Sequence, residues 1–256
     1  IGAETRDRAR RDAARIDAQV DIGEPGTPVV TLAFLALTLL ATAIEFNAFG
    51  TGPTTSELSR AGGVGIGSIA TGAWWKLLAS NLLHANLAHV FTNAFTIFLT
   101  GRWLEHLVGR AVMVATILWS AVVAGIGAVV VDVPTVSIGA SGVAFGILGC
   151  AIAVDPRART AIGIIARQLA VINVVLTFLL PGISMGGHFG GFAAGLAVGA
   201  LCWNRTGSPD HPAGRRRPTV PWVLAAAWVP VAALLLAGPR VLPNEAAAAR
   251  GAITAR

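Results

Sequence analysis

The stretch "GGHFGGFAAGLAVG", residues 186–199, is apolar except for one histidine, and glycine recurs in it at every fourth position. The glycines at this spacing are Gly187, Gly191, Gly195 and Gly199. Residues four apart share one face of a helix, and a face of small residues lets two membrane helices pack closely. A second stretch, "SIGASGVAFG" at 137–146, has Gly142 and Gly146 at the same spacing. We therefore expect these two stretches to form closely packed neighbouring helices.

The composition indicates a polytopic membrane protein. The 256 residues are 54% hydrophobic and only 12% charged, with a mean hydropathy of +0.69, whereas soluble domains carry about 25% charged residues. A helix that spans a bilayer needs about 20 apolar residues. The sequence predicts an all-α membrane helix bundle from apolar runs at 29–46, 87–104, 111–131, 138–154, 168–183, 186–203 and 220–238.

The fourth of these runs is too short to cross the hydrocarbon core alone, because a helix rises only about 1.5 Å per residue. The polar piece before it, "VDVPTVS" at 131–137, must then reach into the membrane. Irregular backbone is tolerated there only where protein covers it or where it lines a wet cavity. We expect a recessed aqueous pocket that ends near Ser141.

Basic residues predict how the chain is oriented, because cytoplasmic loops of membrane proteins are rich in Lys and Arg. With the N-terminus inside, fourteen arginines fall on the inner side: Arg6, Arg8, Arg10, Arg11, Arg15, Arg102, Arg110, Arg157, Arg159, Arg167, Arg205, Arg215, Arg216 and Arg217. Five basic residues fall outside: Arg60, Lys76, Arg240, Arg250 and Arg256. This distribution of basic residues indicates a plasma-membrane protein with a cytoplasmic N-terminus and an external C-terminus. Because the arginines cluster between apolar runs, the net charge of +6 points to membrane orientation rather than to a nucleic-acid partner.

The predicted organisation follows from these runs. It consists of a cytosolic tail (1–28), a six-helix core (29–203), a basic cytosolic loop (204–219), a seventh transmembrane helix (220–238) and an external tail (239–256). The segment 47–86 contains "GAWWKLLASNLLH" and is expected on the outer surface, partly embedded, because tryptophan favours the membrane interface. Cys150 and Cys202 lie inside apolar runs, and their spacing indicates neither a disulfide framework nor a metal site.

Four polar residues from three spans fall at one depth near the outer face. Ser141 begins the fourth span, His188 lies near the start of the sixth, and His89 and Asn93 lie one turn apart at the start of the second. Taken singly, Ser141 can be a packing residue, His188 a satisfied polar group and Asn93 an interhelical hydrogen-bond donor. Together they favour a functional site, because polar groups at this depth usually face a cavity.

These residue types fit acyl transfer. A serine hydroxyl becomes nucleophilic when a base takes its proton, and His188 is the available base. The resulting oxyanion needs donors, which the Ser141 N–H, the Asn93 amide and a His89 ring N–H could supply. Asp132 is the nearest acid to His188 in the predicted arrangement, but it stands in a loop, so we expect a Ser–His dyad rather than a triad.

The ordered set "HANLAHVFTN" (84–93), "GASG" (139–142) and "GGHFGG" (186–191) resembles the rhomboid intramembrane serine proteases over roughly residues 72–203. The resemblance implies Ser141 as nucleophile, His188 as base and His89 and Asn93 on the oxyanion side. It also implies that Phe145 packs on the base. "WWKLLASNLLH" resembles the family's first external loop, with Lys76 where arginine is common. The seventh span fits variants with an extra C-terminal helix.

The resemblance further implies the reaction. A single-span transmembrane protein would unwind near the outer face, enter the site from the bilayer and be cut through an acyl-enzyme, with no metal or organic cofactor. The sequence does not indicate which residues bind the substrate.

Two alternatives stay open. An inactive rhomboid-like protein would lack the Ser141–His188 pair, which is present here. A transporter or channel would carry polar residues through both leaflets, and only Glu45 and Asn173 point that way.

Overall fold

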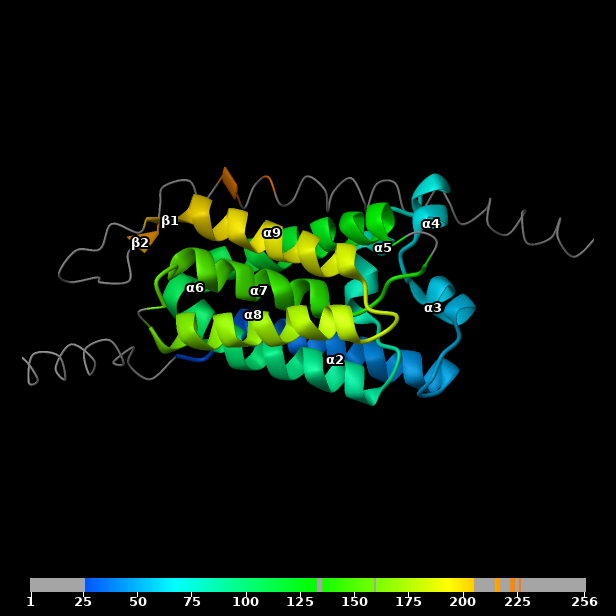
Figure 1. Ribbon diagram of the computed structural model, residues 1–256. Coiled ribbons are helices and arrows are strands. Elements are labelled where there is room, and N and C mark those ends of the chain that lie inside the picture. Colours follow the sequence, from blue (N-terminus) through cyan, green and yellow to red (C-terminus); the bar gives the residue numbers. More distant parts are fainter. Residues whose placement is uncertain are drawn as a thin grey trace, which may run out of the picture.

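The computed structural model describes residues 26–132, 135–158, 160–204, 215–216, 222–223 and 226 (Figure 1). The predicted tails apart from residues 26–28, and most of the predicted basic loop and seventh helix, lie outside the described residues. Within the described part the fold is all-α, as predicted, apart from the two-residue strands β1 (Trp203–Asn204) and β2 (Arg215–Arg216), which pair antiparallel.

The helices, in chain order, are α2 (Val29–Phe49), α3 (Thr55–Ala61), α4 (Ile66–Ala70), α5 (Lys76–Ala79), the 3₁₀ turn η1 (Ser80–Leu82), α6 (Leu87–Val131), α7 (Ser141–Val154), α8 (Ala161–Leu179) and α9 (Met185–Cys202). Among the described residues, α2, α6 and α9 are long and apolar enough to cross a membrane, while α7 and most of α8 are shorter apolar helices.

Helix α6 is two spans joined at a glycine. Gly109 has φ 78° and ψ 167°, which breaks the helix between 87–108 and 110–131. A Cβ on Gly139 would lie 3.6 Å from Asn93 Nδ2 in the first half, and one on Gly142 would lie 2.4 Å from Ala124 Cβ in the second. Both ends of α6 therefore meet the start of α7, so the two halves run antiparallel. They match the predicted second and third spans.

The fifth span begins earlier than predicted. The apolar run indicated 168–183, but α8 covers Ala161–Leu179. Thr160 caps its start by accepting the Gly163 N–H at 3.2 Å, while the Asp155 carboxylate accepts the Thr160 N–H at 2.7 Å. Arg167, which interrupts the apolar run, donates to backbone carbonyls of the preceding turn. The capping groups, rather than hydropathy, set this boundary.

Helix α9 packs against both α6 and α7 through glycines on two of its faces. A Cβ on Gly195 would be 1.8 Å from the Gly146 carbonyl oxygen, and one on Gly191 would be 2.0 Å from that of Gly142. These contacts confirm the predicted close packing of α7 and α9. A second, adjacent face was not predicted: there Gly186 approaches α6, and its Cβ would lie 2.1 Å from the Gly127 carbonyl oxygen.

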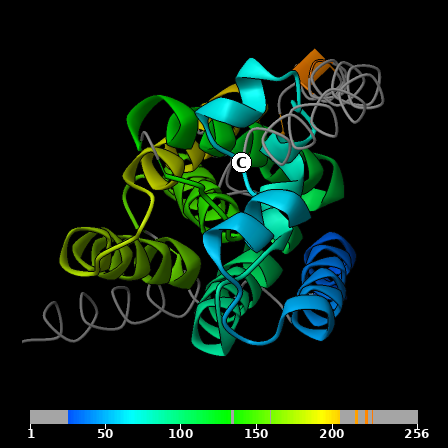
Figure 2. The same cartoon turned by 90° about the vertical axis from the view of Figure 1, so that its right-hand side faces the viewer.

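Helix α7 is the central element of the bundle. Nearly all its residues after Ser141 are buried, and the end-on view places it in the middle with α2 and α8 on opposite sides (Figure 2). Helix α8 presents large apolar side chains outward: Ile164, Val171, Ile172, Val175, Leu176, Phe178 and Leu179. Such a surface suits contact with lipid acyl chains.

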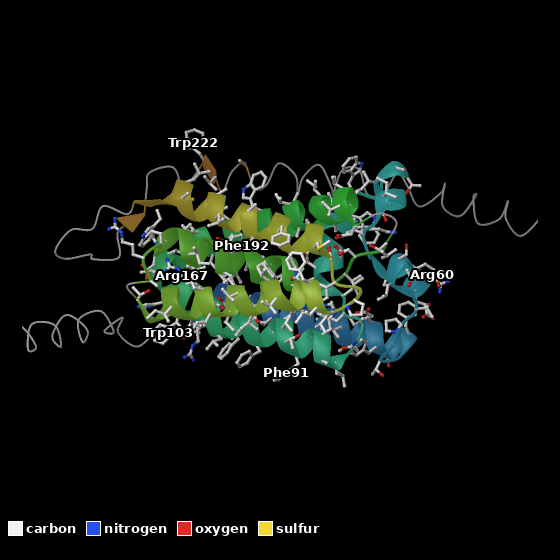
Figure 3. All side chains as sticks on the ribbon, in the orientation of Figure 1. Arg60, Phe91, Trp103, Arg167, Phe192 and Trp222 are labelled. Atoms are coloured by element: carbon white, nitrogen blue, oxygen red, sulfur yellow. The ribbon has the colours of Figure 1, made fainter. Side chains whose placement is uncertain are left out.

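The segment between α2 and α6 gathers at one end of the bundle, where α3, α4 and α5 lie together (Figure 1). A β-bridge joins Val64 to Ser137, and the Gly139 N–H donates to the Ser80 carbonyl at 2.8 Å. Protein groups thus satisfy the irregular backbone that leads into α7 at Ser137 and Gly139, and the segment becomes buried at Gly139 and Ala140. Arg60 lies at this end and Arg167 at the other (Figure 3).

Candidate active site

Ser141 is the first residue of α7, at the end of the bundle that carries α3 to α5. Its N-cap, Ala140, makes no side-chain cap hydrogen bond. The first N–H groups of a helix have no intrahelical partner, so they are available to an anion. Ser141 is partly exposed and lines a small polar cleft with Ser80, Asn81, Ser184 and Gly187. The predicted recess at this residue is therefore present.

His188 lies in the first turn of α9 and is 6% exposed. Its ring stacks on Phe145, one turn after Ser141, with centroids 4.2 Å apart and planes at 22°. His188 is therefore held against the same face of α7 that carries Ser141. Among the described residues no hydrogen bond joins Ser141 to His188, and catalytic hydrogen bonds in apo structures often form only with substrate.

The Nδ1 atom of His188 faces the hydroxyl group of Thr177. It lies 2.7 Å from Thr177 Oγ1 on α8. Asp132 is engaged elsewhere: it accepts from the Ser184 hydroxyl and, at 3.2 Å, from the Gly186 N–H, which places it at the start of α9. The sequence interpretation missed Thr177, because a threonine in an apolar run carries no distinguishing pattern.

His89 and Asn93 lie beside the backbone that enters α7. A Cβ on Gly139 would be 2.7 Å from His89 Nε2 and 3.6 Å from Asn93 Nδ2, and Gly139 has φ +118°. A side chain at this position would be strained and would displace the His89 ring. The four predicted residues, from α6, α7 and α9, thus gather at one end of the bundle.

His84 is a further member of the site, and it is fully buried. Its Nε2 lies 3.1 Å from Asn93 Nδ2 and accepts the Ala140 N–H at 3.4 Å. Both partners are donors, so Nε2 must carry a lone pair and Nδ1 the proton. Nδ1 lies 3.0 Å from Thr42 Oγ1, which can accept that proton.

The His84 network reaches the first span. Glu45 Oε2 accepts the His84 N–H at 2.9 Å, which ties α2 to the loop before α6. Burial, followed by the charge of the nearby His89, lowers the pKa of His84 to about 3, in keeping with a neutral ring. His84 begins the "HANLAHVFTN" motif, but the motif alone did not distinguish its role from that of His89.

Within the described part of the chain, no cluster of three His, Cys, Asp or Glu side chains is arranged to hold a metal ion. Cys150 and Cys202 are both buried free thiols. The polar groups around Ser141 are hydroxyls, amides and imidazoles, which suit proton transfer and hydrogen bonding to a developing anion.

The Rhomboid domain family matches residues 71–205. The chain is 32% identical over 140 residues to the putative rhomboid protease YdcA of Bacillus subtilis, covering 52% of this chain and 70% of that protein. It is 32% identical over 181 residues to the rhomboid protease GluP of Bacillus subtilis, covering 68% of this chain but 35% of that protein.

Similarity extends to plants. Over 154 residues the chain is 28% identical to RHOMBOID-like protein 4 of Arabidopsis thaliana, covering 58% of this chain and 39% of that protein. The matched domain and the apolar helices make this a multi-pass membrane protein. Because the domain covers more than half of the sequence and holds Ser141, His188, His89 and Asn93, the chain belongs to the rhomboid family of intramembrane serine proteases.

Proposed function

We propose that this protein is a serine endopeptidase that cleaves single-span transmembrane proteins near the outer face of the plasma membrane. The observation that carries the proposal is the stacking of His188 on Phe145, one turn after Ser141, across the glycine contact of α7 and α9. A general base is thereby held beside a hydroxyl at an uncapped helix start, in a polar cleft.

The reaction follows from these positions. Ser141 Oγ attacks the scissile carbonyl carbon while Nε2 of His188 takes the hydroxyl proton. His188 then gives this proton to the leaving amine, which leaves an acyl-enzyme on Ser141. A water molecule, deprotonated by His188, attacks the ester, and the serine recovers its proton as the new carboxyl end departs. Hydroxyl and imidazole groups suffice for every proton transfer in this sequence.

The oxyanion would be met by three donors. The Ser141 N–H belongs to the free first turn of α7, Asn93 offers the amide hydrogen that His84 does not use, and His89 lies against Gly139. Donors fixed before the reaction stabilise a developing charge without reorganisation. The bond from Asn93 to His84 holds the amide in one orientation, which supports this role.

The outer-face location rests on charge. The site lies at the end of the bundle that holds Arg60 and α5, which begins at Lys76, whereas Arg167 lies at the other end (Figures 1 and 3). In the sequence, fourteen of the nineteen basic residues fall on the predicted inner side. Glu45 and Asn173, the two residues that left a transporter function as an alternative, both have hydrogen-bond partners. Glu45 accepts the His84 N–H, and Asn173 donates to the Leu169 carbonyl at 2.8 Å. Their bonds favour structural roles over a path through both leaflets.

A serine-reactive fluorophosphonate probe tests the proposal. Wild-type protein in detergent should be labelled and should cut a model single-span substrate, while Ser141→Ala should do neither at unchanged thermal stability. His188→Ala should retain the hydroxyl but lose both reactions. Cleavage by a folded Ser141→Ala protein would exclude this mechanism. A wild type that folds but neither labels nor cuts would favour an inactive, client-binding rhomboid.

A further inference from the structure

Thr177 is the residue whose hydroxyl faces Nδ1 of His188, the proposed base. It lies on α8, is 4% exposed, and its Oγ1 is 2.7 Å from His188 Nδ1. The same hydroxyl donates to the Asn173 carbonyl, one turn earlier, at 2.7 Å. Both distances are typical of well-formed hydrogen bonds.

The proton count of this hydroxyl fixes the direction of both bonds. A carbonyl oxygen cannot donate, so the single hydroxyl proton of Thr177 points to Asn173. The remaining lone pairs of Oγ1 can only accept, which requires the proton of neutral His188 on Nδ1. Nε2 then carries the lone pair that a base needs.

Two contacts fix the ring itself. The stack on Phe145 sets the plane of the imidazole, and the bond to Thr177 sets its rotation within that plane. The acid nearest to α9, Asp132, is bound to Ser184 and to the Gly186 N–H. Within the described residues no carboxylate takes the place of the Thr177 hydroxyl.

We propose that Thr177 is the positioning residue of the base, so that the site works as a Ser141–His188–Thr177 set. This inference rests on the proposed protease function. When His188 takes the Ser141 proton on Nε2, the ring becomes a cation whose Nδ1–H still donates to Thr177 Oγ1. The proton returns from Nε2 to the leaving amine, and none passes through the threonine.

The test compares Thr177→Val, which keeps the shape but removes the hydroxyl, with Thr177→Ser, which keeps the hydroxyl. Thr100→Val is the matched control, because Thr100 is also buried and donates to its own helix at 2.6 Å but faces no histidine. We expect Thr177→Val to lower kcat about 10- to 100-fold with KM within about twofold, the range for one hydrogen bond to a charged group. Thr177→Ser and Thr100→Val should stay near wild type.

Several outcomes separate the inference from the proposed function. If Ser141→Ala abolishes cleavage but folded Thr177→Val cuts at the wild-type rate, the Thr177 role is refuted and the protease proposal stands. An equal loss in Thr177→Val and Thr100→Val, or no rescue by serine, would also overturn it. If Ser141→Ala still cuts, the protease proposal itself fails.

Nitrogen-15 NMR of the histidine rings provides a readout that does not depend on how Thr177→Val folds. In Ser141→Ala protein, comparison with a His188→Gln derivative identifies the His188 signals. The proposal requires a protonated Nδ1 and an unprotonated Nε2 near neutral pH. A proton on Nε2 would overturn it, because such a ring cannot accept the serine proton.

Discussion

At the scale of single residues, the site contains only hydroxyl, amide and imidazole groups, and hydrogen bonds fix the direction in which they point. Asn93 illustrates this, since one amide hydrogen is committed to His84 Nε2 at 3.1 Å and the other remains for an anion. His84 can accept it only while neutral. The orientation of the Asn93 amide therefore depends on His84 and on its protonation state.

Asn93→Ala should leave weak residual activity, with kcat reduced about 10²- to 10³-fold, the usual cost of losing one oxyanion donor. The reduction should appear in initial rates at saturating substrate, with fluorophosphonate labelling slowed in parallel. Thr92→Ala is the neighbouring control, because its exposed hydroxyl bonds only its own helix at 2.9 Å. An unchanged rate in Asn93→Ala would remove Asn93 from the oxyanion site.

His84 should make the fold sensitive to acid. Its pKa is about 3 when folded and near 6.5 when unfolded, so below about pH 6.5 the unfolded chain binds the extra proton. Stability should therefore fall with pH by about 1.4 kcal/mol per unit until about pH 3. His84→Gln removes this contribution to the pH dependence of stability, while His89, whose ring lies 5.0 Å away, is present in both proteins.

The measurement is thermal unfolding of wild type and His84→Gln at about pH 7.5 and about pH 4.5. Wild type should lose about 2–3 kcal/mol more than the variant over this interval, from about two pH units of linkage. A difference between the two proteins that does not change with pH would show that His84 does not titrate as described.

At the scale of helices, function depends on how closely α7 and α9 approach. The glycine pairs let carbonyl oxygens of α7 lie where side chains of α9 would otherwise be. This contact brings Phe145 under His188 and thus sets the distance between Ser141 and His188, the proposed nucleophile and base. The same glycines also serve packing, so fold and chemistry share one interface.

Gly195→Ala tests this contact. Its Cβ would lie 1.8 Å from the Gly146 carbonyl oxygen, and backbone cannot yield cheaply, so the helices must separate. We expect a loss of about 1–3 kcal/mol of stability together with a reduced kcat. Gly67→Ala on α4 is the control, because a Cβ there meets nothing within 4 Å. Thermal unfolding and cleavage should both stay near wild type in the control, and an unaffected Gly195→Ala would contradict the proposed packing constraint.

At the scale of the whole molecule, the orientation of the protein in the membrane decides at which membrane face the proposed site meets a substrate. Arg60 and Arg110 are both exposed, on opposite sides in the predicted topology. In intact cells, Arg60→Cys should react with a membrane-impermeant maleimide, whereas Arg110→Cys should react only after permeabilisation. Wild type sets the background, because Cys150 and Cys202 are buried. The reverse pattern would place the site at the cytoplasmic face.

The sequence by itself determined the fold class, the positions of the spans α2, α6, α7 and α9, and the candidate residues Ser141, His188, His89 and Asn93. It could do so because apolar runs, glycine spacing and polar residues at one depth are local patterns. The start of α8 escaped it, because a capping network around Asp155 and Thr160 overrides the apolar pattern.

Only the tertiary structure decided which partners orient the site. Thr177 reaches His188 from a neighbouring helix, and Glu45 and Thr42 reach His84 across about 40 residues of chain. Hydrogen bonds between side chains on separate helices leave no periodic trace in a sequence. Helix packing alone brings such donors and acceptors within bonding distance, and thereby determines which histidine nitrogen carries the proton.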